Sequence, residues 1–118
     1  MLFRRRPGRL SAVQAHQRTA HGQANLLDVR ETHEWLAGHA PGALHVPLSR
    51  LRAGASLPQA AQGRPLIVIC RSGNRSRQAV DVLADSGLEA TDVTGGMIAW
   101  TADGLPVVDG HGGNGVVV

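Results

Sequence analysis

The chain has 118 residues, a length that allows one domain with a single hydrophobic core. Its single cysteine excludes an intramolecular disulfide and a metal site with several thiolate ligands, and it fits a reducing compartment. The net charge is +3, the sequence contains no lysine, and four arginines lie in residues 1–9, which we expect to form a flexible basic lead-in that binds neither nucleic acid nor membrane.

The sequence carries no signal for a membrane span, a metal or a cofactor. No apolar run approaches the length of a membrane span, and the N-terminal arginines are not followed by the apolar core of a secretory signal. The six histidines include no i, i+4 pair, so we predict no metal site. We expect a cytoplasmic monomer that works without a cofactor.

Helix and strand signals alternate along the first half of the chain. Ser11 can cap a helix that runs to about residue 20, with Leu10, Val13 and Ala20 on its apolar side. The other elements expected here are a strand over 25–29, a helix over 31–37, a strand over 43–46 and helical turns over 48–51 and 59–62.

The second half begins with the apolar run Leu66–Ile69, which predicts a strand buried on both faces, as central parallel strands are. From Ser76 onward the apolar spacing becomes helical. The remaining expectations are a strand over 89–93, a short helix over 97–100 and a glycine-rich tail over 109–118 with mobile glycines. Alternating strands and helices indicate an α/β domain with a mainly parallel sheet, whose ligands bind beyond the carboxyl ends of strands.

Cys70 stands at such a strand end and is followed by small and polar residues. The backbone N–H groups of a tight loop before a helix converge, and the helix N-terminus adds partial positive charge. The same field stabilises a thiolate, and Arg71 and Arg75 add full charges to it. A lone cysteine is usually a buried apolar residue, but two arginines, two serines and an asparagine do not suit a core. We interpret Cys70 as a nucleophile.

Four segments of the chain then match, in order, the pattern of one family. They are Leu26–Glu31, Glu34–Trp35 with Gly38–Ala43, Cys70–Ser76, and Gly95–Trp100 leading to Gly104–Val107. Through them the chain resembles the single-domain rhodanese (thiosulfate sulfurtransferase-like) family over about residues 10–108, which we take as the domain between lead-in and tail. The resemblance implies a three-layer rhodanese-like fold, with a sheet of about five mainly parallel strands flanked by helices.

The resemblance also implies a two-step sulfur transfer. The Cys70 thiolate takes the outer sulfur of an anionic donor such as thiosulfate and becomes a persulfide, and a thiophilic acceptor (cyanide in vitro, a cellular thiol or a protein) then removes that sulfur. The N–H groups of the loop would hold the terminal sulfur, and Arg71 and Arg75 would bind the donor oxygens. The expected substrate-binding residues are Arg71, Ser72, Gly73, Asn74, Arg75 and Ser76.

Two other functions remain open at this point. Phosphatases with a rhodanese-like fold carry Cys-x5-Arg, commonly after a histidine, whereas this chain has Cys70, then Arg75 as Cys-x4-Arg, with Ile69 before the cysteine. The shorter ring favours sulfur over phosphate or arsenate. A persulfide carrier or interaction module that loads sulfur without turnover would look nearly the same in sequence.

Three polar residues outside the loop are weaker candidates. Asp28 can act as a base, but a structural acceptor for loop N–H groups or for Arg30 is the better interpretation. Arg30 itself is expected to form an ion pair with Glu31 or Glu34. His39 lies in a Gly-His-Ala-Pro-Gly turn and can face the site, although sulfur transfer from an existing thiolate needs no base.

Overall fold

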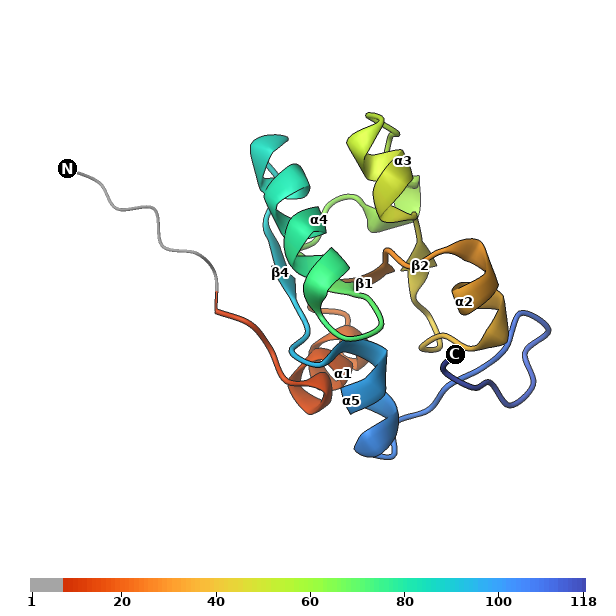
Figure 1. Ribbon diagram of the computed structural model, residues 1–118. Helices are drawn as coiled ribbons and strands as arrows, with labels where there is room; N and C mark the ends of the chain where they lie inside the picture. Colours follow the sequence, from red (N-terminus) through yellow and green to blue (C-terminus); the bar gives the residue numbers. More distant parts are fainter. Residues whose placement is uncertain (1–7) are drawn as a thin grey trace.

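A computed structural model describes residues 8–118 and shows one four-stranded parallel sheet between two layers of helices (Figure 1). The strand order is β2-β1-β3-β4. The strands are β1 (Asn25–Asp28), β2 (Leu44–His45), β3 (Leu66–Ile69) and β4 (Ala90–Asp92). The α/β three-layer class predicted from the sequence is confirmed, with four strands in place of about five; Leu10 adds only a single parallel bridge to Val93 beside β4.

Helices cover both faces of this sheet. They are α1 (Ala12–Ala20), α2 (Thr32–Ala37), α3 (Leu48–Arg52), the 3-10 turn η1 (Gln59–Ala61), α4 (Asn74–Asp85) and α5 (Gly96–Ala102). The core cluster on one face includes α3 and α4 residues, and the cluster on the other includes α1 and α5 residues (Figure 1). The sheet is therefore buried on both sides, which explains why all four residues of β3 are buried.

Two local predictions need correction. The helix expected from Ser76 begins two residues earlier, at Asn74, so the loop after Cys70 is tighter than the sequence pattern indicated. In α1 the predicted cap at Ser11 is present, but Ala12 and Ala15 form the buried face while Val13 is 41% exposed. Small alanine side chains allow α1 to approach the sheet closely, and this selects a different face from the one that larger apolar residues suggest.

Only part of the predicted lead-in can be compared with the structure, because residues 1–7 lie outside the described residues. Gly8 and Arg9 are held against β4: the Thr91 hydroxyl donates to the Gly8 carbonyl (2.6 Å), and Arg9 forms an ion pair with Asp92 (3.0 Å). Arg9 is exposed, but this ion pair ties it to β4. The reason is that Asp92 is buried in a strand and needs a cationic partner.

The glycine-rich segment 109–118 is hydrogen-bonded to α2. The Gly110 N–H donates to the Leu36 carbonyl and the Val116 N–H donates to the Ala37 carbonyl (both 2.9 Å). At the tip of this segment the Asp109 carboxylate accepts from two backbone N–H groups, those of His111 and Gly113, which lower the pKa of Asp109. Among the residues described, no helix has the length and apolar character required to cross a membrane.

Candidate active site

Cys70 follows β3 at the carboxyl edge of the sheet, where the sequence predicted a site. Its side chain is 1% exposed, and the loop turns into α4 within three residues. Gly73 makes this turn possible with a φ of 112°, a value that L side chains rarely adopt. The Gly73 N–H then donates to Cys70 Sγ over 3.1 Å. The nucleophile predicted from the sequence thus has a backbone donor aimed at its sulfur.

The start of α5 fixes the orientation of the loop peptides. The Met97 N–H donates to the Cys70 carbonyl (2.8 Å) and the Ile98 N–H donates to the Arg71 carbonyl (3.1 Å). Because the C=O and the following N–H of a trans peptide point in opposite directions, the N–H groups of Arg71 and Ser72 are directed away from α5. Gly96 permits this approach, since a Cβ there would lie 2.3 Å from the Cys70 carbonyl oxygen.

Arg75 is paired with a carboxylate of α2. Its Nη1 and Nη2 donate to the two oxygens of Glu34 over 2.6 and 2.8 Å. These hydrogen bonds lower the pKa of Glu34 to about 2 and raise the pKa of Arg75. The predicted pairing of Arg30 with Glu31 or Glu34 is therefore wrong: Glu34 binds the loop arginine instead.

Arg30 pairs with Asp28, and both side chains are fully buried. The Arg30 Nη2 donates to Asp28 Oδ2 and to the Gly38 carbonyl, each over 2.7 Å, and the Arg30 backbone N–H donates to Asp28 Oδ1. Asp28 is thus the structural acceptor that the sequence favoured. The pair joins the end of β1 to the end of α2, which carries Glu34.

Arg71 is hydrogen-bonded to the C-terminal segment. Its side chain is exposed, and Nε donates to the Val118 carbonyl over 3.0 Å. A guanidinium has five N–H donors, so this bond leaves four for other acceptors. Of the other predicted loop residues, Ser72 and Asn74 are exposed whereas Gly73 and Ser76 are buried.

The sequence did not indicate what lies behind the sulfur. The Cys70 thiol donates to Ser76 Oγ (3.4 Å), and the Ser76 hydroxyl donates to Asp92 Oδ2 (2.8 Å). Asp92 also accepts from Nε and Nη2 of Arg9, both over 3.0 Å. The one feature of the sequence that could have indicated these contacts was Asp92 in a short predicted strand, because a buried carboxylate requires hydrogen-bond or cationic partners.

His39 is held in place by its neighbours on α2. Its Nδ1 bonds to the Trp35 carbonyl over 2.8 Å, and because a carbonyl only accepts, Nδ1 carries the proton. The ring stacks on the Trp35 ring with centroids 3.5 Å apart. The backbone of His39 also pairs with that of Val108. Through these contacts His39 packs against α2 and the Val108 strand bridge, which is a structural role.

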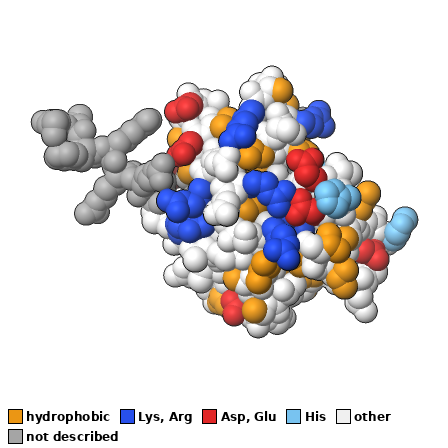
Figure 2. Space-filling view, viewed as in Figure 1, with side chains coloured by type: hydrophobic (Ala, Val, Ile, Leu, Met, Phe, Trp, Pro, Cys, Tyr) orange, Lys and Arg blue, Asp and Glu red, His pale blue; other side chains and the backbone are white. Residues whose placement is uncertain are grey.

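The face that carries the start of α4 is charged. Figure 2 shows arginine, acidic and histidine side chains gathered there, with hydrophobic side chains beside them. Exposed apolar residues bonded to the loop through their backbones are Ile98 and Val118. Within residues 8–118, no group of three or more His, Cys, Asp or Glu side chains is arranged to hold a metal ion.

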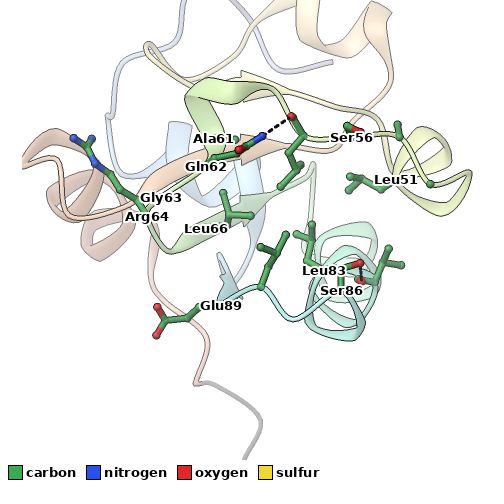
Figure 3. Close-up of a pocket in the computed structure, with 15 residues that line it drawn as sticks. Leu51, Ser56, Ala61, Gln62, Gly63, Arg64, Leu66, Leu83, Ser86 and Glu89 are labelled. Carbon is green, nitrogen blue, oxygen red and sulfur yellow. Dashed lines mark hydrogen bonds between the residues drawn. The ribbon is translucent and has the colours of Figure 1, made fainter.

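A pocket of about 570 Å³ lies at the other end of β3 (Figure 3). Figure 3 shows Leu51, Leu66 and Leu83 projecting into it from α3, β3 and α4. Its lining contains no cysteine or histidine. The pocket and the cysteine loop are therefore separate regions.

Comparison with known proteins identifies related domains. The family model described as rhodanese-like domain matches residues 11–103. An uncharacterized protein of Synechocystis sp., slr1261, is 42% identical over 84 residues, which are 70% of this chain and 46% of that protein. The adenylyltransferase and sulfurtransferase UBA4 of Yarrowia lipolytica is 39% identical over 75 residues, which are 64% of this chain and 19% of that protein.

A solved structure of similar size also matches. The human single-domain sulfurtransferase TSTD1 is 29% identical, and the superposition covers 80% of this chain and 95% of the human chain with a TM-score of 0.68. By contrast, the chain spans about half of the Synechocystis protein and about a fifth of the Yarrowia protein. The similarity to those two proteins is a similarity to one of their domains.

Proposed function

This chain belongs to the rhodanese-like domain family, and from that premise we propose that it is a sulfurtransferase that carries sulfane sulfur as a persulfide on Cys70. The observation that carries the proposal is the Gly73 N–H directed at Cys70 Sγ over 3.1 Å, in a loop whose first two carbonyls are turned toward α5. Donors placed in this way stabilise negative charge on sulfur, both on the thiolate and on the outer persulfide sulfur.

Thiosulfate is the proposed donor. The Cys70 thiolate attacks the outer sulfur of thiosulfate, a new S–S bond forms, the S–S bond of the donor breaks, and its electron pair leaves with sulfite. A thiophilic acceptor then attacks the outer persulfide sulfur and regenerates the thiolate. With cyanide as acceptor the product is thiocyanate.

The two loop arginines are proposed to play different parts in this reaction. Arg71 is exposed and keeps four N–H donors for the sulfonate oxygens of the donor. Arg75 is engaged through both Nη atoms with Glu34, so it anchors the start of α4 and contributes its charge to the field at Cys70. We therefore propose that Arg71 binds the donor directly and that Arg75, contrary to our expectation from the sequence, does not.

The test is intact mass spectrometry after incubation with thiosulfate, with and without a reductant, followed by a cyanide-to-thiocyanate assay. We expect a reversible gain of one sulfur, about 32 Da, on the wild type and none on Cys70→Ser. Turnover with cyanide establishes the enzyme. A protein that gains no sulfur from thiosulfate contradicts the proposal for this donor, and a phosphatase substrate is then the next to test.

A persulfide carrier that discharges only to a protein partner is the second candidate. It is favoured by the apolar surface beside the loop, where Val118 is 51% exposed and Ile98 is also exposed, and by the burial of Cys70. Such surface is typical of a site that docks a protein. Sulfur loading without cyanide turnover would support this candidate over the enzyme.

A further inference from the structure

A chain of hydrogen bonds runs from the nucleophile to the partly exposed side chain of Arg9. It passes from Cys70 Sγ to Ser76 Oγ (3.4 Å), from Ser76 Oγ to Asp92 Oδ2 (2.8 Å), and ends in the bidentate contact of Asp92 with Arg9. Cys70, Ser76 and Asp92 are each at most 4% exposed, whereas the Arg9 side chain is 34% exposed. The chain therefore places a buried carboxylate two hydrogen bonds from the reacting sulfur.

The Ser76 hydroxyl has one proton and two neighbours that compete for it. The Asp92 carboxylate can only accept, so in this structure the proton of Ser76 lies toward Asp92 and the thiol proton lies toward Ser76. When Cys70 loses its proton to solvent, the S–H bond breaks and Sγ becomes an acceptor. Ser76 can then donate to Sγ only if it turns away from Asp92.

Arg9 makes that turn possible. It donates Nε to Asp92 Oδ1 and Nη2 to Asp92 Oδ2, so both carboxylate oxygens keep a partner after Ser76 has left. Without Arg9, the same turn would leave a buried carboxylate with neither a hydrogen bond from Ser76 nor a neutralising charge, facing a thiolate of the same sign. The Arg9 Nη2 also donates to the Gly73 carbonyl (3.2 Å), in the residue whose N–H points at Sγ.

We propose that Arg9 and Asp92 are positioning residues for Cys70. Their ion pair allows the Ser76 hydroxyl to donate to the thiolate, and Arg9 neutralises the negative charge of the Asp92 carboxylate behind the sulfur. The inference deepens the proposed function and relies on Cys70 reacting as a thiolate. The other charged or titratable groups around the end of the sheet include Arg71, the Arg75–Glu34 pair with Glu31 beside it, the Asp28–Arg30 pair, and His45, which bonds to the Arg30 carbonyl; α5 contributes none.

The test is the pH profile of Cys70 alkylation by iodoacetamide. Cys70 is the only cysteine, so alkylation reports on it alone, and it needs neither a sulfur donor nor an acceptor. A change in access scales the rate equally at every pH, whereas a change in the thiolate fraction moves the profile along the pH axis.

We expect Arg9→Gln to move the profile about one unit to higher pH, which slows alkylation about tenfold at pH values where the thiol is still mostly protonated. Asp92→Asn should move the profile to lower pH. In the Asp92→Asn background, Arg9→Gln should change the rate by less than about twofold, because Arg9 acts through Asp92. Arg18→Gln, which removes an exposed arginine from α1, is the matched control and should leave the profile in place.

Two results would overturn the inference. One is an Arg9→Gln profile that coincides with that of Arg18→Gln. The other is an equal shift by Arg9→Gln with and without Asp92, which is the behaviour of a distant charge. If Arg9→Gln does not fold, Asp92→Asn decides alone: its shift should be smaller in a Ser76→Ala background, and a shift of full size there contradicts the role of the hydroxyl. A normal alkylation response in a protein that accepts no sulfur from thiosulfate would refute thiosulfate as the donor and leave this inference standing.

Discussion

The two ends of β3 are four residues apart in sequence and opposite in chemistry. At the amino end, Leu66 joins Leu51 and Leu83 around a pocket with a largely apolar lining (Figure 3). At the carboxyl end, Cys70 is met by a backbone N–H, a serine hydroxyl and, beyond them, the ion pairs Arg75–Glu34 and Arg9–Asp92.

This difference separates stability from reactivity within one strand. Apolar burial at the amino end stabilises the fold in proportion to the area removed from water. The polar groups at the carboxyl end must each lose water on burial, so only part of their mutual attraction appears as net stability, and we propose that their main effect is a field that favours negative charge on sulfur. Substitutions at the two ends should therefore change different observables.

The largest effect is expected at the sulfur itself. Cys70→Ser should abolish sulfur transfer, lowering turnover by at least about a thousandfold, because a hydroxyl is not ionised near neutral pH and forms no persulfide. The Gly73 N–H can donate to an oxygen as well as to a sulfur, so we expect the free energy of unfolding to change by less than about 1 kcal/mol. Thiocyanate formation and thermal unfolding measure the two effects, and substantial turnover in the variant would remove Cys70 as the nucleophile.

The opposite effect is expected from Leu83→Ala at the amino end. Leu83 is buried on α4 beside the pocket, and its truncation leaves a cavity that should cost about 2–4 kcal/mol of stability. For a domain of this size that lowers Tm by roughly 10 °C. Below the transition, kcat/KM with thiosulfate should equal that of the wild type. A matching loss of kcat/KM would show that the two ends are coupled through α4.

The sequence predicted the features that depend on local pattern. The apolar run 66–69, the cap at Ser11 and the polar residues after Cys70 each carry their signal within a few positions, and the structure contains all of them. The alternation of strands and helices indicated the α/β class with a mainly parallel sheet, and the resemblance to a known family added the rhodanese-like fold, which the domain match confirms.

The partners of the charged residues could not be predicted in this way. Glu34 and Arg75 are 41 positions apart, and Arg9 and Asp92 are 83 apart, so their pairing depends on how the ends of β1, β3 and β4 meet. From sequence, Arg9 looked like one more arginine of a solvated segment. Only the register of the sheet, which sets Val68 opposite Asp92, places that carboxylate beside the cysteine loop.

The Arg75–Glu34 pair gives the carboxyl end of the strand a pH-dependent contribution to stability. The pKa of Glu34 is lowered from 4.5 to about 2 in the fold, chiefly by the hydrogen bonds from Arg75. A lowered carboxyl pKa contributes stability that is fully present above the unfolded value and is lost as the pH falls through the folded value. Between about pH 4.5 and pH 2, the free energy of unfolding should therefore fall by up to about 3 kcal/mol through this group.

Glu34→Gln isolates this contribution. The variant should be less stable than the wild type at pH 7 and should lose less stability on acidification, which urea unfolding at a series of pH values would measure. Glu89→Gln, an exposed acid at the pocket rim, is the matched control at the amino end and should follow the wild-type curve. If Glu34→Gln and the wild type lose the same free energy between pH 4.5 and pH 2, the ion pair does not stabilise the fold.

The smallest expected effect distinguishes the two arginines of the loop from an arginine at the other end of the strand. Arg71→Ala should raise KM for thiosulfate about tenfold with little change in kcat, because an exposed guanidinium that orients the donor contributes mainly to binding.

Arg75→Ala should instead lower kcat and stability together, since it releases Glu34 and the start of α4. Arg64→Ala, at the pocket, removes the same charge and should leave both kinetic constants unchanged. Steady-state kinetics at fixed ionic strength separate these outcomes, because equal increases in KM for all three variants would mean that only the net charge of the domain attracts the donor.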